Sequence, residues 1–426
     1  MVRPTIAAAA CCLLLAAASP AGRPEPLGPR SLASQPAVKA ALAEADRRLE
    51  SHVREWIRIA EIPAPSGGEQ RRADYLEKRF REMGLDEVRR DAAGNVIGLL
   101  KGADPGLPKV ALVAHMDTVA PATADHTVRR EAGRLTGPGV RDDSSGLAGM
   151  VAAVELMKLH ALTPPADLFL VASVREEVGL HGAESFVKDH AASLGAVVAL
   201  DGHLGQVSYG ATGIAWLKLV FTGEGAHTLR SHEKASAVLA AARAIERVAA
   251  IPLRRSPPTQ ETWLNVGMLG GGDVPNALPS SAWFVVDLRA NDPAAFEELQ
   301  RKVLDIGART AREIGVGFEH ETVHRMEGAG IAGFESSVLV RSARDVLGHL
   351  GWREVELTPR GSADHNVALA RGIPGIAIGL TTGDGAHTPG EYADIEPFST
   401  GVKQVLLLSL MPLTVKPDRS GQVNGS

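Results

Sequence analysis

Six acidic or imidazole side chains follow apolar runs of the sequence or lie in glycine-rich turns: His115, Asp142, Glu176, Glu177, Asp201 and His387. Imidazole nitrogens and carboxylate oxygens are ligands that zinc takes in proteins. A hydrolase that activates water with metal needs several such groups to converge, together with a free carboxylate that accepts a proton. The set is large enough to hold two zinc ions and to supply that base.

The His-Met-Asp segment places His115 and Asp117 two positions apart at the end of an expected strand. Side chains with this spacing point to the same side of a strand. We therefore expect the Asp117 carboxylate to accept the second imidazole N–H of His115 and so to fix its tautomer, as metal-bound histidines usually require. Taken alone, such a pair is more often part of a surface turn.

Acidic pairs occur in two further segments. A glycine-rich turn carries Asp142 and Asp143 ahead of a helix, where an aspartate is commonly an N-cap. Glu176 and Glu177 are expected to end a buried strand, where adjacent carboxylates repel each other and are expensive to desolvate without cations. If one glutamate coordinates metal, the other is free to act as a general base.

Two isolated residues complete the candidate ligand set. Asp201 ends the next apolar run in the same manner as the glutamates, and His387 lies in the loop GDGAHTPGEY. A lone loop histidine is more often an ordinary surface residue, and we expect that of most of the 14 histidines. We include His387 among the candidate metal ligands only because the other candidates occur in the same chain.

The elements that must position these residues alternate between strands and helices. Apolar runs that end in candidate ligands are followed by helical patterns, which predicts an α/β domain with a mostly parallel sheet flanked by helices. In such a sheet, ligands collect at the carboxyl ends of the strands. The expected strands lie at 109–117, 167–177 and 196–203, with short ones near 87 and 96, and the expected helices at 38–62, 70–83 and 146–160.

The pattern changes between residues 206 and 325. Strand, helix, strand, strand, helix and strand follow one another there, and this is the order of a ferredoxin-like α+β module. The module interrupts an α/β domain whose two parts we place at 22–205 and 326–414. The second part is expected to contain helices at 336–350 and 395–411 and a strand at 373–380.

Composition narrows the function classes. The chain has 426 residues, a size that favours two domains, and 45% of them are hydrophobic. Its 45 basic and 50 acidic residues give a net charge of −5. Because binding to nucleic acid requires an excess of basic residues, this composition gives no reason to expect a nucleic-acid partner. The sequence lacks the G-x-S-x-G motif, which argues against a serine hydrolase. Small or mixed-charge substrates fit this composition better.

The first residues have the profile of an export signal. Arg3 precedes an apolar stretch from Ile6 to Ala18 that is too short to span a bilayer, and small residues follow. We expect a signal peptide at 1–21, cleaved after Ala18 or Ala21, and a periplasmic or secreted protein without membrane attachment after its removal. A lipid-modified Cys11 is the competing interpretation. At the other end, 415–426 is expected to be a mobile polar tail.

Taken in order, these motifs resemble the co-catalytic zinc metallopeptidases, a family that includes tripeptide aminopeptidase, carnosinase-type dipeptidases, glutamate carboxypeptidase, succinyl-diaminopimelate desuccinylase and aminoacylase. The resemblance covers nearly the whole chain after the signal segment. The segments that carry it are IPAPSGGE, HMDTVAP, GPGVRDDSSGLAG, REEVGLHGAESF, ALDGH, NVGMLGGGDVPNALPSSAWFVVDLR, RGSADHNVALARGIPGIAIG and GAHTPGEYADI.

The resemblance implies a role for each candidate in the metal centre. It implies two Zn²⁺ per chain, with Co or Mn as possible replacements, and a cis peptide bond between Asp142 and Asp143. One zinc would be bound by His115 and Asp201, the other by Glu177 and His387, and Asp142 would bridge both. Glu176 would be the general base, and Asp117 would orient His115.

The inserted module resembles the lid and dimerisation domain of the same family, which implies a homodimer formed through this module. His227 matches a histidine that reaches the partner's site and stabilises the oxyanion, although Thr228 departs from the commoner neighbour. Asn276 and Arg289 match residues around substrate and lid, and Arg289 could equally be a structural ion pair. Asp364 and His365 match a segment that lines the site, and which of them touches substrate stays open.

We expect hydrolysis of an amide bond by a hydroxide bridged between the two metals, with Glu176 as the group that accepts and returns the proton. In the family that the chain resembles, aspartate at the position of Asp201 accompanies aminopeptidases and dipeptidases. A short peptide is therefore the expected substrate. An N-acyl amino acid amidohydrolase or a carboxypeptidase of the same family is the alternative, and a non-catalytic binding protein on the same fold is a further one.

Overall fold

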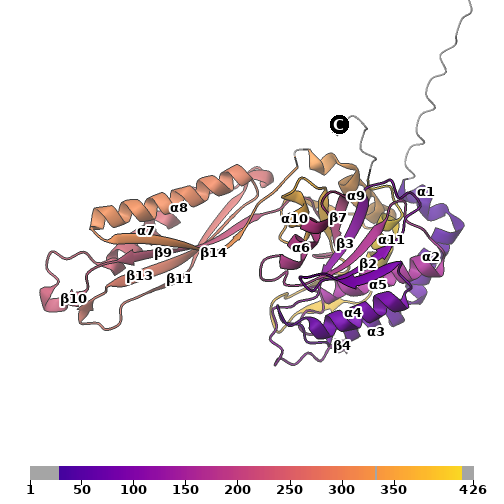
Figure 1. Cartoon of the computed structure of the whole chain (residues 1–426), viewed down its shortest axis with the longest axis horizontal. Coiled ribbons are helices and arrows are strands. Elements are labelled where there is room, and N and C mark those ends of the chain that lie inside the picture. The colour runs from indigo at the N-terminus through magenta and orange to yellow at the C-terminus, as the bar shows by residue number, and fades with distance from the viewer. Residues whose placement is uncertain (1–27, 332, 415–426) are drawn as a thin grey trace, which may run out of the picture.

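The structure is a computed structural model that describes residues 28–331 and 333–414. The expected signal peptide at 1–21 and the expected tail at 415–426 lie outside the described residues. The chain forms a rounded α/β body from which an elongated insert extends (Figure 1). Within the part of the chain that the structure describes, no helix is both long enough and apolar enough to cross a membrane.

The body is built on one large sheet with the strand order β1-β2-β6-β3-β7-β16-β8-β15. The four central strands β6, β3, β7 and β16 are parallel, and antiparallel pairs occur toward both edges. The strands are β1 (Glu87–Arg90), β2 (Val96–Leu100), β3 (Lys109–His115), β6 (Leu168–Ser173), β7 (Leu194–Ala199), β8 (Gln206–Ser208), β15 (Glu356–Thr358) and β16 (Gly375–Ile378).

Helices cover both faces of this sheet. Alternate residues of the central strands enter two different apolar clusters, as Leu112 and Val113 do, so both faces must be buried. One face packs against α1 (Pro29–Ser34), α2 (Pro36–Arg47), α3 (Leu49–Ala60), α4 (Gln70–Glu82), α5 (Ser144–Leu159), α9 (Val338–His349) and α11 (Phe398–Ser409). The other packs against α6 (His181–His190) and α10 (His365–Leu369).

A small antiparallel sheet lies beside the carboxyl ends of the central strands. Its order is β17-β18-β5-β4, so it joins a segment near residue 390 to one near residue 135. This pairing brings the loop that carries His387 next to the turn that carries Asp142. The strands are β4 (Arg129–Glu131), β5 (Arg134–Thr136), β17 (Gly383–Asp384) and β18 (Tyr392–Asp394).

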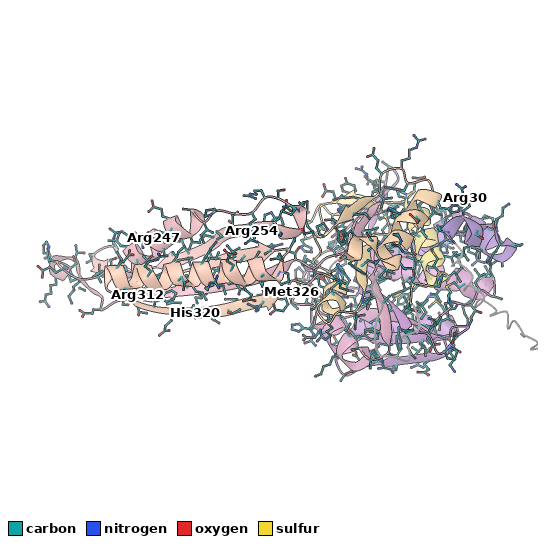
Figure 2. The ribbon with its side chains drawn as sticks, turned by 90° about the horizontal axis from the view of Figure 1, so that it is seen from above. Arg30, Arg247, Arg254, Arg312, His320 and Met326 are labelled. Atoms are coloured by element: carbon teal, nitrogen blue, oxygen red, sulfur yellow. The ribbon has the colours of Figure 1, made fainter. Side chains whose placement is uncertain are left out.

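The insert is a four-stranded antiparallel sheet in the order β11-β13-β9-β14, with two helices on one face. This is the ferredoxin-like arrangement that the sequence predicts. It joins the body near Met326, and Arg247, Arg254 and Arg312 lie along it (Figure 2). Its elements are β9 (Gly213–Thr222), α7 (Ala237–Ala249), β11 (Thr262–Gly271), β13 (Ser281–Ala290), α8 (Pro293–Ile314) and β14 (Gly317–Met326). The short pair β10 (Ala226–His227) and β12 (Ala277–Leu278) lies at its far end (Figure 1).

Three sequence predictions differ from the structure in detail. The single helix expected at 38–62 is two helices, because Arg48 leaves the helical conformation with φ −94° and ψ 5°. The strand expected at 167–177 ends at Ser173, and Arg175 has a positive φ of 54°, which bends the chain before the glutamates. The expected boundary at 206 falls inside the body, because β8 pairs with β15 and β16, and the sheet of the insert begins at Gly213.

Two buried histidines make stability depend on pH. His52 in α3 and His365 in α10 are 3% and 0% exposed, and burial lowers the pKa of each imidazole to about 4. A histidine in the unfolded chain titrates near 6.5, so below that pH the unfolded state binds protons that the folded state does not. The free energy of unfolding should fall between about pH 6.5 and about pH 4, by up to about 3 kcal/mol for each histidine.

Urea unfolding at several pH values measures this effect. We expect His52→Leu to show a shallower loss of stability below pH 6.5 than the unaltered protein, and an unchanged slope above it. A variant that loses stability as steeply as the unaltered protein would contradict the assignment to His52.

Candidate metal centre

His115 is the last residue of β3, and hydrogen bonds fix both ring nitrogens. Its Nδ1 lies 2.9 Å from the backbone carbonyl oxygen of Asp117. A carbonyl only accepts, so Nδ1 carries the hydrogen, and Nε2 faces Oδ1 of Asp142 at 2.9 Å. The backbone therefore presents Nε2 of His115 as a ligand toward a carboxylate.

The Asp117 carboxylate takes a different part from the one expected. It lies 3.6 Å from Nδ1 of His115, so the carbonyl of the same residue is the closer acceptor. The carboxylate instead accepts backbone N–H groups of Glu176 at 2.9 Å and Glu177 at 3.2 Å, and the hydroxyl of Ser66 at 2.6 Å. Asp117 thus holds the turn that carries both glutamates, because that turn replaces the strand expected there.

The two aspartates of the glycine-rich turn divide two roles between them. The peptide bond between Asp142 and Asp143 is cis. Asp143 caps α5 by accepting the N–H of Gly146 at 3.0 Å, and it also accepts the backbone N–H of His115. Asp142 points the other way, with Oδ1 2.9 Å from Nε2 of His115 and Oδ2 3.3 Å from Nε2 of His387. The N-cap prediction is therefore confirmed at Asp143, while Asp142 is left free of the cap and directed at the two histidines.

Glu177 lies on the other side of His387. Its Oε2 is 2.9 Å from Nε2 of His387, while its Oε1 is buried and has no hydrogen-bond partner among the described residues. His387 itself adopts a positive φ of 66° in its loop, which turns the ring toward the carboxylates. A buried carboxylate oxygen without a partner is costly, and a cation is one way to satisfy it.

The candidate metal centre contains more carboxyl groups than its two histidines could neutralise. Burial opposes ionisation of Asp142, yet the His115 and His387 imidazoles hold the pKa of its carboxyl far below its usual range. Burial raises the pKa of Glu176 well above its usual value, that of Glu177 to about 7 and that of Asp201 to about 6. Neighbouring carboxylates add to these three shifts. Divalent cations would relieve this repulsion.

The donor set suits metal. One ligand atom each from His115, Asp142 and Glu177 lie within 4.8 Å of one another, and His387 contacts two of these residues. Asp201 lies outside this close set. It is half-buried just after β7 and lines the same large cavity as Asp142, whose charge helps to raise its pKa. Imidazole and carboxylate donors in this arrangement fit zinc.

Glu176 adjoins the centre without entering the close set. Its Oε2 lies 4.0 Å from Nε2 of His115, and its side chain lines the large cavity. Asp364 is one of the groups that raise the pKa of Glu176, after burial. A carboxyl beside the ligands, exposed to the cavity and favoured in its protonated form, is placed to exchange a proton with a bound molecule.

The remaining predicted residues are dispersed. His227 and Asn276 lie together at the far end of the insert, where Thr228 donates to the backbone of Asn276, and neither residue lines a cavity described here. Arg289 lines the large cavity and pairs with Asp287 at 3.1 Å. Asp364 is buried against Ser173 and lines neither cavity, whereas its neighbour His365 lines the large one.

Sequence reasoning missed three residues near the centre. Arg141 is buried, donates to the carbonyl of Gly202 at 3.1 Å and lies 4.0 Å from Asp142. Arg360 lines the large cavity and pairs with Glu261. Glu391 is buried beside the Asp142 turn. Adjacency to the aspartate pair was the available signal for Arg141, and nothing in the sequence pattern marked the other two.

Glu391 fixes the conformation of the turn that carries Asp142. Its carboxylate accepts three backbone N–H groups, from Gly139 at 2.9 Å, Arg141 at 2.8 Å and Asp142 at 2.9 Å. Glutamine would put an amide N–H against donors, so Glu391→Gln should displace Asp142. Because groups that orient ligands carry much of a metal's affinity, we expect metal affinity to fall by about 10- to 100-fold.

Titration of metal-free protein against a competing chelator measures this affinity. Glu396→Gln, at an exposed site in the same part of the chain, is the matched control and should bind metal normally. Equal affinities in the two variants would contradict the role of Glu391.

Comparison with known proteins places this geometry in context. A family model described as Peptidase family M20/M25/M40 matches residues 111–410. The chain is 27% identical to an uncharacterized protein, YqjE, of Bacillus subtilis (strain 168), over 83% of this chain and 96% of that protein. It is 26% identical to carboxypeptidase G2 of Pseudomonas sp. (strain RS-16), over 76% of this chain and 79% of that enzyme.

A solved structure shares the fold. Aminopeptidase PepT from Bacillus cereus ATCC 10987 superposes with a TM-score of 0.73 at 24% sequence identity. The superposition covers 84% of this chain and 97% of that one. The likeness therefore includes both the body and the insert.

Proposed function

Because the chain belongs to peptidase family M20/M25/M40 and is a hydrolase of that family, we propose that it is a metal-dependent exopeptidase that removes the N-terminal residue of short peptides. One observation carries the metal part of this proposal: both oxygens of Asp142 face histidine nitrogens, at 2.9 Å and 3.3 Å. A carboxylate with a histidine on each oxygen is arranged as a bridge between two cations.

The ligands divide into two groups around that bridge. His115 and Asp201 would hold one Zn²⁺, Glu177 and His387 the other, and Asp142 both; Co or Mn could take the same donors. Bound metal would polarise the carbonyl of the peptide bond to be cleaved and would lower the pKa of a bound water. The protein contributes the geometry, because strand ends and hydrogen bonds set the ligand positions before metal arrives.

Glu176 is the group that moves the proton. It would take a proton from the attacking water and give it to the departing amine, so one carboxyl serves first as base and then as acid. The Asp117 carboxylate keeps Glu176 in place by accepting the backbone N–H of Glu176 at 2.9 Å. Burial of Glu176 supports this assignment, because a raised pKa favours return of the proton.

Two observations favour an aminopeptidase. The chain shares its fold with the aminopeptidase PepT, and it has aspartate at position 201, which the resemblance stated above associates with aminopeptidases and dipeptidases. The match to carboxypeptidase G2 keeps carboxypeptidase or N-acyl amino acid amidohydrolase activity as the second candidate.

Three substrates separate these candidates. Purified protein loaded with zinc would be assayed against a tripeptide, a dipeptide amide and an N-acetyl amino acid. An aminopeptidase cleaves the first two and leaves the third, whereas a deacylase cleaves the third. A free carboxyl terminus is required by a carboxypeptidase, so cleavage of the amide argues against one. No cleavage of any of them would favour a binding protein and reject the proposed activity.

The insert would join two chains into a homodimer. The support is its exposed apolar surface, which includes Leu229, Met268 and Leu269, and the position of His227, which is exposed and remote from the cavities of its own chain. A histidine placed there would serve the site of the second copy. Mixing Glu176→Ala and His227→Ala proteins tests this, since hybrid dimers with one complete site should recover activity that neither parent shows.

Export is the proposed localisation. Its support is the sequence of residues 1–21, which carries both cysteines of the chain and leaves none in the remainder. A chain without cysteine is suited to an oxidising compartment. Fractionation of cells that express the full chain, with N-terminal sequencing of the product, would test this.

A further inference from the structure

Two cavities meet at the candidate metal centre. The larger, of about 1190 Å³, extends from the centre toward the insert, and the smaller, of about 400 Å³, opens beside it in the body. Asp142, Glu177 and His387 line both cavities. A bond cleaved at these residues therefore has the two cavities on either side of it.

Apart from this shared edge, the small cavity is lined by apolar residues, glycines and threonines, and by Asp125, Arg129 and Glu391. Its apolar walls are Val119, Ala120, Pro121, Ala124, Pro138 and Pro389. Its charged groups are compensated, because Arg129 lies 3.8 Å from Asp125 at the exposed rim, and the Glu391 carboxylate is occupied by three backbone N–H groups. The small cavity therefore favours an uncharged ligand.

The large cavity carries more basic groups. Its lining includes Arg141, Arg289 and Arg360, of which Arg289 pairs with Asp287 and Arg360 with Glu261, together with Trp216 and Trp263. Guanidinium groups recognise carboxylates, and a short peptide carries one at its C-terminus. The C-terminal part of a peptide thus fits the large cavity, which leaves the small cavity for the part on the other side of the cleaved bond.

On the basis of the proposed peptidase function, we propose that the small cavity is a specificity subsite that binds the apolar side chain of the N-terminal residue of the substrate. A cavity of about 400 Å³ accepts a leucine or phenylalanine side chain, and burial of such a side chain strengthens binding. The enzyme would then prefer peptides that begin with a large apolar residue, while the identity of the C-terminal residue matters less.

Two peptide series test this. In the first, Xaa-Gly-Gly, the N-terminal residue changes from glycine to alanine, leucine and phenylalanine; in the second, Gly-Gly-Xaa, the C-terminal residue changes in the same way. We expect kcat/KM to rise at least tenfold along the first series and by less than about threefold along the second, since tenfold corresponds to burial of roughly one apolar side chain.

Filling the cavity should abolish the preference. Ala124 lines the small cavity, and Ala122 in the same loop is exposed and lines neither cavity, so the pair Ala124→Trp and Ala122→Trp is matched. Ala124→Trp should raise KM for Leu-Gly-Gly at least tenfold and change Gly-Gly-Gly little, and Ala124→Leu should give a smaller effect in the same direction. Ala122→Trp should leave both substrates unchanged.

A binding measurement supports the kinetics independently of turnover. Free leucine, the expected product, should bind the unaltered protein more tightly than Ala124→Trp by calorimetry. Equal losses on all peptides, or losses confined to the second series, would overturn the subsite while the unaltered protein still cleaves peptides. Failure of the unaltered protein to cleave any peptide would overturn the proposed function, and the subsite with it.

Discussion

Replacing Glu176 by alanine should lower kcat by about 10²- to 10⁴-fold while about two metal ions stay bound to each chain. The carboxyl lines the large cavity and lies 4.0 Å from His115, but it stands outside the close ligand set. Its removal therefore takes away proton transfer and spares the metal ligands.

The contrast with its neighbour makes this result specific. Glu177 contacts His387 at 2.9 Å and has a buried oxygen without a partner among the described residues, as a ligand would. Glu177→Ala should therefore lose about one metal ion per chain as well as activity. The two adjacent glutamates thus separate the base from the ligand in one experiment.

Metal content by plasma emission spectroscopy and steady-state kinetics on the same samples provide the measurement. Glu176→Gln is a second variant, because glutamine keeps the shape of the side chain and cannot accept the proton. Turnover within tenfold of the unaltered protein in both variants would reject Glu176 as the base. Loss of metal from Glu176→Ala would move this residue into the ligand set.

Replacing Asp142 by alanine should remove both metal ions, the largest effect on metal binding that we expect from one substitution. Its two oxygens face His115 and His387, so it is the one carboxylate of the close set that contacts a histidine on each side. Without it, each metal would keep only two protein ligands, and no negative charge between the two cations would offset their repulsion.

Metal stoichiometry and thermal unfolding in the presence and absence of added zinc measure this effect. The unaltered protein should gain stability with zinc, because a ligand that binds the folded state stabilises it. Asp142→Ala should show almost no gain, whereas Glu177→Ala should show a partial one. If Asp142→Ala still bound one metal tightly, Asp142 would belong to a single site and would not be a bridge.

The linear order of the chain determined the class of fold and most of the candidate ligands. Apolar runs that end in polar residues predict parallel strands, and parallel strands of one sheet deliver their ends to one edge, so His115, Glu177 and Asp201 could be predicted to meet. Hydrophobic pattern and strand polarity are local properties, and they are legible without coordinates.

Tertiary structure alone decided which polar group contacts which. The bend at Arg175 ends the strand early, so Asp117 binds the glutamate turn through its carboxylate and leaves His115 to a carbonyl. Glu391 reaches the Asp142 turn because β18 pairs with β5 across more than 250 positions of sequence. The same pairing and the placement of the insert shape two cavities of different polarity. Contacts of this kind depend on how distant segments pack, and no local pattern encodes them.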